Sequence, residues 1–196
     1  MDPTLSPQEN SQKFFDRYGK LKRTAEALDK LLQETKAEID HLESIQNSLD
    51  IALSADDLVQ IKQELTEYGF IKKNRSGKKE KIKSKPFHYL SSDGYDIYVG
   101  KNNYQNDELT FKFATGNDWW FHAKGMPGSH VIVKSKGEEM PDRVFEEAGM
   151  LAGFYSKGRD SDKIEIDYLQ KKNVKKPAGS APAVSYTHLT LPTILR

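Results

Sequence analysis

A seven-residue repeat of apolar side chains constrains this chain more than any other feature of its sequence. Between Phe14 and Leu53, positions spaced alternately by four and three residues are mostly apolar, and this run holds no proline and a single glycine, Gly19. A stripe with this period is typical of a coiled-coil helix. The sequence therefore predicts one long helix whose apolar seam packs against another helix.

Helix-end signals frame this seam. Ser6, Pro7 and Glu9 combine a cap residue, a proline suited to the first turn and a carboxylate placed to return a bond to the cap. A second, shorter helix follows the cap residue Ser54 and ends at Gly69. Because this helix cannot cover the whole seam, we expect one strand of the coiled coil to come from elsewhere. A helix hairpin that only spaces two domains is the alternative.

A basic segment follows the helical part. Residues 70–86 hold eight lysines and arginines and one glutamate, although the net charge of the whole chain is only +1. The segment is too polar to form a core, and its cations would gain free energy by releasing counterions from nucleic acid. We interpret it as a linker, with a solvated hinge as the alternative. The predicted phosphate contacts are Lys72, Lys73, Arg75, Lys78 and Lys79.

From Phe87 onward the apolar period changes to two, interrupted by two stretches with helical spacing. Strands are predicted at 87–90, 95–99, 118–124, 130–135 and 163–168, and helices at 102–114 and 141–157. The element order is ββαββαβ. The predicted class is α+β, with a long coiled-coil arm followed by a small domain whose sheet is mostly antiparallel.

The most distinctive side chains lie in the segment DWWFHAKGMPGSH. On a strand, Trp119 and Phe121 share one face, while Trp120 and His122 share the other. We predict that Trp119 and Phe121 pack beneath the following helix. For Trp120 and His122, a second covered face is one interpretation, and exposed rings that stack on RNA bases are the other. We count both residues as candidate RNA contacts.

The turn after this strand contains Gly125, Gly128 and Ser129. Successive backbone N–H groups in such a turn can point at a phosphate, and Lys124 and His130 would add charge. All five are therefore candidate RNA contacts. A tight strand connection would use the same glycines and is the alternative.

Catalysis and metal binding fit the sequence poorly. The chain has no cysteine, so it has neither thiolate zinc ligands nor a disulfide. Ser129 and His130 are neighbours that would point to opposite faces of a strand, and His122 and His130 lack a third ligand. We predict no metal, no cofactor and no catalytic residue. An RNA-processing enzyme that uses His122 and His130 as acid and base is the alternative.

A second basic run occurs near the end of the chain. Taken alone, it is typical of a solvated sheet edge. Together with the segment at 70–86 it suggests a second place where phosphates bind. Its candidate residues are Lys171, Lys172, Lys175 and Lys176.

The last residues differ in character from everything before them. The stretch VSYTHLTLPT at 184–193 holds no charge and no period. Read back into codons, it reproduces a transposon adapter used in sequencing libraries. We therefore interpret residues 183–196 as an artefact of adapter read-through.

Several stretches resemble the NFACT family, called RqcH in bacteria and NEMF in animals. DWWFHAKGMPGSHVI and DYLQKKNVKKPAG are similar to its RNA-binding NFACT-R domain, and SPQENSQKFFDRYGKLKR is similar to its coiled-coil middle region. The predicted parts are an arm at 1–69, a basic linker at 70–86, an RNA-binding domain at 87–182 and the artefact at 183–196. Because the family continues with further strand residues, we expect one sheet edge to be unpaired.

The resemblance implies a role in ribosome quality control. Members of the family bind 50S ribosomal subunits obstructed by peptidyl-tRNA, recruit alanyl-tRNA and promote alanine tailing of the stalled chain. By resemblance, the arm would contact rRNA and stalk-base proteins and the second domain would contact RNA, in the cytoplasm and away from membranes. The family's amino-terminal domain, which serves tailing, has no counterpart here, so we expect a binding module and not an enzyme.

An older family name, fibronectin-binding protein, suggests a surface adhesin as a further alternative. Residues 1–20 contain no apolar core of the kind that a secretion signal needs. This counts against the adhesin.

Overall fold

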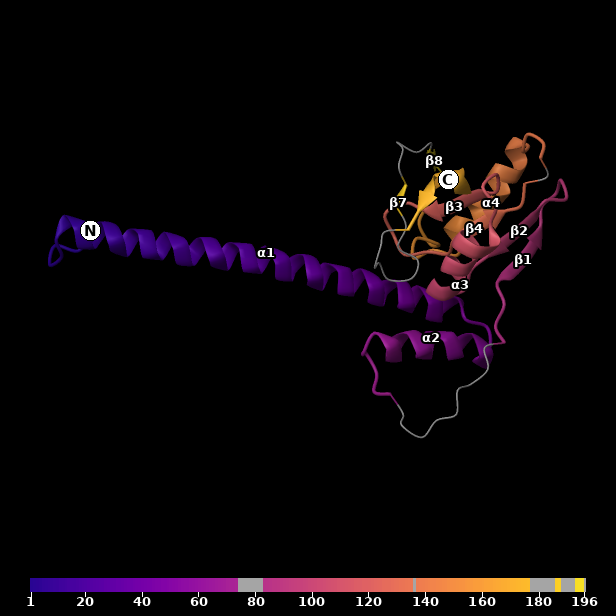
Figure 1. Ribbon diagram of the computed structural model, residues 1–196. Coiled ribbons are helices and arrows are strands. Elements are labelled where there is room, and N and C mark those ends of the chain that lie inside the picture. Colours follow the sequence, from indigo (N-terminus) through magenta and orange to yellow (C-terminus); the bar gives the residue numbers. More distant parts are fainter. Residues whose placement is uncertain (74–82, 136, 177–185, 188–192, 196) are drawn as a thin grey trace. The chain divides into compact units, whose positions relative to one another are not determined.

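The predicted long helix is present as α1 (Pro7–Ile51) in the computed structural model (Figure 1). Its start carries the expected capping box, because Ser6 N donates to Glu9 Oε2 at 2.8 Å and Glu9 N donates to Ser6 Oγ at 3.3 Å. The structure describes all residues except 74–82, 136, 177–185, 188–192 and 196. In that part of the chain, no helix offers the apolar length that a membrane span requires.

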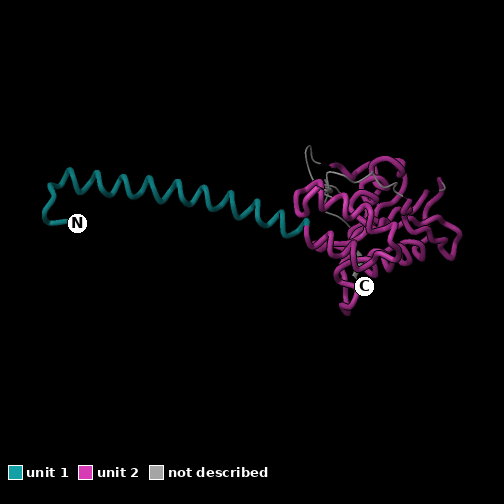
Figure 2. The backbone as a smooth tube through the Cα atoms, turned by 90° about the horizontal axis from the view of Figure 1, so that it is seen from below, with its two compact units in different colours: residues 1–41 teal, residues 42–196 magenta. Residues whose placement is uncertain are grey.

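The chain divides into two compact units, residues 1–41 and 42–196 (Figure 2). Unit 1 contains most of α1, and its large seam side chains are exposed, from 50% at Ile39 to 64% at Tyr18. Because these side chains are uncovered in the described part of the chain, the partner helix stays a prediction. Unit 2 begins inside α1, so the last turns of this helix belong to the same unit as the sheet.

Unit 2 contains a six-stranded sheet in the order β1-β2-β4-β3-β5-β8, in which every pair is antiparallel, and a small sheet of β6 and β7. Its elements are α2 (Ala55–Glu67), β1 (Phe87–Leu90), β2 (Asp96–Val99), α3 (Asn103–Glu108), η1 (Leu109–Phe113), β3 (Trp119–Ala123), β4 (Val131–Val133), α4 (Asp142–Phe154), β5 (Glu165–Gln170), η2 (Lys171–Asn173), β6 (Val174–Lys175), β7 (Tyr186–Thr187) and β8 (Thr193–Leu195). The predicted α+β class is confirmed.

The helix predicted at 102–114 is present but changes type midway. It begins as α3, capped by the side chain of Asn102, which accepts from Gln105 N, and it continues as the π-helical turn η1. The backbone N–H of Ala114 donates to the carbonyl of Leu109, five residues earlier, at 2.8 Å. This wider turn brings Thr110 to within 2.8 Å of the ring of His130.

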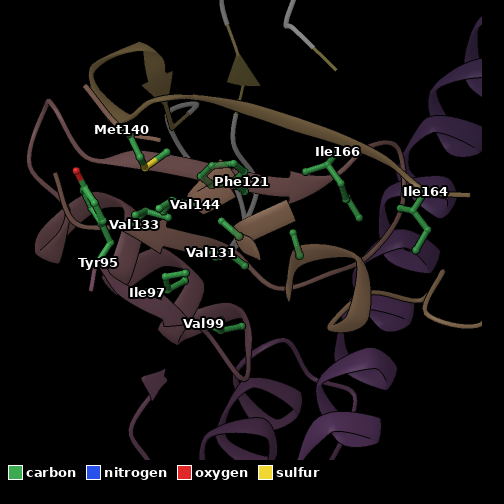
Figure 3. Close-up of a cluster of buried hydrophobic side chains, with 13 residues drawn as sticks. Tyr95, Ile97, Val99, Phe121, Val131, Val133, Met140, Val144, Ile164 and Ile166 are labelled. Atoms are coloured by element: carbon green, nitrogen blue, oxygen red, sulfur yellow. The ribbon is translucent and has the colours of Figure 1, made fainter. Parts of the chain in front are cut away.

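The larger core lies between the sheet and α4, where side chains from both gather (Figure 3). Phe121, Val131 and Val144 have no exposed surface. As predicted, Trp119 and Phe121 pack beneath α4, and the ring of Phe145 contacts both, with centroid distances of 4.7 and 5.8 Å. Burial of one such aromatic side chain stabilises a fold by about 1.5–3 kcal/mol.

One sheet edge was expected to be unpaired, but β5 does not provide it. Strand β8 pairs with β5, and Thr193 lies opposite Asp167. The outer backbone groups of an edge strand bind any extended segment through N–H and C=O groups alone.

Candidate nucleic-acid interface

The structure locates only part of the first basic segment. Lys72 and Lys73 follow α2 and are exposed. Arg75, Lys78 and Lys79 lie outside the described residues. The phosphate contacts predicted for this segment therefore stay predictions.

The second basic run is held in place by its backbone. In η2, the backbone N–H of Lys171 donates to the carbonyl of Asp118 at 2.8 Å, and that of Lys172 donates to the carbonyl of Gly116 at 3.1 Å. Lys175 belongs to β6, which pairs with β7. The side chains of Lys172, Lys175 and Lys176 are exposed, and that of Lys171 is partly buried.

Two phenylalanines of η1 accompany these lysines. The ring centroid of Phe111 lies 6.0 Å from Nζ of both Lys171 and Lys176, and Phe113 is 41% exposed. Lys112, between the two rings in the chain, is exposed. Together these residues form what we call the basic–aromatic patch: Phe111, Lys112, Phe113, Lys171, Lys172, Lys175 and Lys176.

Most of the charge on the basic–aromatic patch is uncompensated. Lys176 forms an ion pair with Asp107. Among the described residues, no ion pair involves the other four lysines. Uncompensated cations beside aromatic rings are what a single-stranded nucleic acid needs, because phosphates bind the charges and bases stack on the rings.

The prediction that Trp120 stacks on bases is wrong, because Trp120 lies in a second, smaller core on the other side of the sheet. Its side chain is only 3% exposed and packs with Ile132 and Leu169. The turn η1 covers this face, contributing Leu109 to the same cluster. Among the described residues, Trp120 Nε1 has no hydrogen-bond partner.

The prediction that His130 contacts RNA is also wrong. Its side chain is 1% exposed and its Nδ1 lies 2.8 Å from Thr110 Oγ1. Its backbone N–H donates to Asn106 Oδ1 at 3.0 Å. Burial and the contact with Thr110 hold the ring inside the fold, where it cannot reach a phosphate of RNA.

His122 remains at the margin of this cluster, only partly buried. Burial lowers the pKa of His122 to about 4, and a hydrogen bond with the backbone of Gly128 opposes this shift. A neutral ring at physiological pH adds no charge for a phosphate. Lys124 is half exposed and forms an ion pair with Glu165 at 3.0 Å, so part of its charge is already compensated.

The turn at 125–129 does not form the predicted phosphate cradle. Gly125 has a positive φ of 66°, which suits a tight turn. The N–H of Ser129 is not available, because it donates to the carbonyl of Tyr155 at 3.0 Å. Gly128 pairs with Ser156 so closely that a Cβ on it would lie 3.0 Å from Ser156 Cβ. Packing of this turn against the end of α4 explains both residues.

No metal site is evident within the described ranges, where no three histidine, aspartate or glutamate side chains gather in a way that could hold an ion. The sequence reasoning missed Phe111, Lys112 and Phe113. The alternation of phenylalanine and lysine at 111–113 could have indicated an exposed basic and aromatic surface. It was not used, because a regular helix was expected there.

Comparison with known proteins identifies the family. Residues 1–84 match the NFACT N-terminal and middle domains, and residues 85–185 match the NFACT protein RNA binding domain. The chain is 43% identical over 189 residues to the Rqc2 homolog RqcH of Streptococcus pneumoniae, covering 95% of this chain and 34% of that protein. It is 34% identical over 185 residues to the RqcH of Bacillus subtilis, covering 93% of this chain and 32% of that protein.

A solved structure agrees with this relationship. The C-terminal part of the fibronectin/fibrinogen-binding protein of Streptococcus suis superposes with a TM-score of 0.85 at 39% identity, covering 98% of this chain and 76% of that one. The chain spans about a third of the length of the curated relatives it matches. From its matches along both halves and its shared fold, the chain belongs to the NFACT family.

Proposed function

We propose that this chain is the RNA- and ribosome-contacting part of a ribosome quality-control factor. The observation that carries the proposal is the basic–aromatic patch, four of whose lysines are uncompensated within the described residues, in the part of the chain that matches an RNA-binding domain. The S. pneumoniae and B. subtilis relatives are named Rqc2 homolog RqcH, and a mouse relative is named ribosome quality control complex subunit NEMF. Their names support a ribosomal target.

In this proposal the chain binds 50S subunits obstructed by a peptidyl-tRNA. Phosphates of rRNA or tRNA bind the basic–aromatic patch and the lysines at 72–73, while the seam of α1 belongs to an arm that reaches the stalk base. The complete protein would recruit alanyl-tRNA and support alanine tailing. The chain itself acts as a binding module in the cytoplasm, without catalysing a reaction.

Co-sedimentation with purified ribosomal subunits tests this function. The whole chain is mixed with 50S subunits over a series of salt concentrations, with 30S subunits as the matched control. Selective binding to 50S subunits that weakens with salt is the expected result, because phosphate contacts release counterions. Equal binding to both subunits would contradict the proposal. So would the absence of binding to 50S subunits by a chain that circular dichroism shows to be folded.

A second candidate is supported by one observation. The S. suis structure carries the name of a fibronectin- and fibrinogen-binding protein. Two binding measurements separate the two functions. One is the binding of the chain to immobilised fibronectin, and the other is its binding to RNA at the same mass concentration. We expect the RNA signal to dominate, since the uncompensated lysines favour a polyanion.

A further inference from the structure

A row of aromatic rings crosses one end of the sheet on the face away from α4. His88 in β1 lies opposite Tyr98 in β2, and their rings stack at a centroid distance of 4.6 Å and an interplanar angle of 13°. Phe113 in η1 meets Tyr98 edge-on at 4.7 Å and 68°. These three rings form what we call the aromatic ladder: His88, Tyr98 and Phe113.

The aromatic ladder is accessible. The side chain of His88 is 52% exposed and Phe113 is 41% exposed, whereas Tyr98 is partly buried and packs against the smaller core. Tyr98 thus anchors the row while its neighbours present ring surface to solvent. Exposed rings held in a fixed order provide a surface for stacking at a low cost in side-chain entropy.

Cations border the aromatic ladder on the side of η1. Lys134 Nζ lies 4.8 Å from the ring centroid of Phe113, and Lys112 is its neighbour in the chain. Two carboxylates are also present: Asp96 pairs with His88 at 2.7 Å, and Asp118 pairs with Lys134 at 2.5 Å. Lys112, next to Phe113 in the chain, has no ion pair among the described residues.

We propose that the aromatic ladder is a stacking platform for the bases of single-stranded RNA, whose phosphates bind the lysines of the basic–aromatic patch. This proposal rests on the proposed function and narrows it to one kind of RNA. In a duplex, the bases are stacked on each other and cannot reach a protein ring, whereas bases of loops and single strands can. Every base has a π face and can stack on a protein ring. The platform therefore distinguishes single-stranded from double-stranded RNA but does not distinguish one base sequence from another.

The variant Phe113→Leu tests the platform, because leucine keeps an apolar side chain but removes the ring. The matched control is Phe154→Leu, which removes another exposed phenylalanine, on α4, with the guanidinium of Arg159 5.9 Å from its ring centroid. Affinity is measured by fluorescence anisotropy for three probes, namely a short oligoadenylate, an abasic strand of the same length and an RNA duplex. Thermal unfolding of each variant is recorded in parallel.

We expect Phe113→Leu to weaken oligoadenylate binding by about 5- to 150-fold, the effect of losing one base–aromatic stack, with no change in the salt dependence. The abasic strand and the duplex should bind both variants and the wild type alike. If the wild type binds oligoadenylate, then an unchanged affinity of Phe113→Leu, or an equal loss of affinity in Phe154→Leu, would overturn the platform. The ladder would then be assigned to a protein partner. Failure of the wild type to bind any probe would instead overturn the proposed function together with the platform.

Discussion

Replacing Asp57 with asparagine should destabilise unit 2 strongly at neutral pH and less at acidic pH. Asp57 is the third residue of α2 and completes its capping box with the cap residue Ser54, and its side chain is 2% exposed. One carboxylate oxygen accepts from Lys101 Nζ at 3.0 Å and from Ser84 Oγ at 2.5 Å. The other accepts from the backbone N–H groups of Leu53 and Ser54, both at 3.1 Å.

The magnitude follows from the pKa of Asp57. Burial alone would raise this pKa, but the hydrogen bonds from Ser84, Lys101, Leu53 and Ser54 outweigh burial and lower it to about 2 from 3.8. A folded-state pKa below the unfolded value means that the ionised form stabilises the fold, by about 2 kcal/mol at pH 7. This contribution is complete above about pH 5, falls to about half at pH 3 and vanishes below about pH 1.

Asparagine has no ionised form and leaves the ammonium of Lys101, whose side chain is 14% exposed, without its carboxylate. The loss at pH 7 should therefore be about 2–4 kcal/mol, and at pH 3 about 1 kcal/mol smaller. Urea unfolding followed by tryptophan fluorescence measures it, because both tryptophans lie in β3 and report on unit 2 alone. Asp56→Asn, an exposed substitution in the same helical turn, is the control and should cost less than about 1 kcal/mol. Equal stability losses for the two variants, or the same loss for Asp57→Asn at pH 7 and pH 3, would refute this reasoning.

Three further predictions concern other sites. Gly100→Ala should destabilise unit 2 by about 1–3 kcal/mol in urea unfolding, because a Cβ there would lie 2.2 Å from Asn106 Oδ1, the atom that accepts from His130 N. An unchanged unfolding midpoint would argue against this close packing. His122 should titrate near pH 4 in a proton NMR experiment, since desolvation of its partly buried ring disfavours protonation, and a midpoint near 6.5 would show that the ring is solvated. Replacing Lys171, Lys172 and Lys175 together with alanine should reduce the slope of log affinity against log salt concentration for single-stranded RNA by about 2, because each phosphate that a lysine neutralises adds about 0.7 to this slope. An unchanged slope would show that these lysines do not contact the RNA.

The sequence predicted the strands and helices well because their signals are local. The turn between the strands predicted at 87–90 and 95–99 is an example: Gly94 has a φ of 74°, which glycine adopts readily, and its N–H donates to the carbonyl of Ser91. The period of two likewise placed Trp119 and Phe121 on the face covered by α4. Neither inference needed knowledge of residues distant in the chain.

The candidate site was harder to predict because burial of the second face depends on distant residues. An aromatic residue opposite the core face of a strand is exposed only if nothing covers it, and η1 covers Trp120. The same turn carries Phe113, whose side chain is exposed. A single irregular turn therefore buries Trp120, which was predicted to contact RNA, and exposes a phenylalanine that was not.

The polar run at 102–106 explains how this turn is held. On a surface helix such residues would face solvent, yet Asn102, Gln105 and Asn103 are each at most 2% exposed. Gln60 Oε1 in α2 accepts from Asn102 Nδ2 at 2.9 Å and from Gln105 Nε2 at 2.8 Å, and Asn103 Nδ2 donates to Glu64 Oε1 at 2.8 Å. Because buried amides without such partners would be costly, α2 and α3 specify each other's position. Since η1 continues directly from α3, the packing of α2 also fixes where the basic–aromatic patch lies on the sheet.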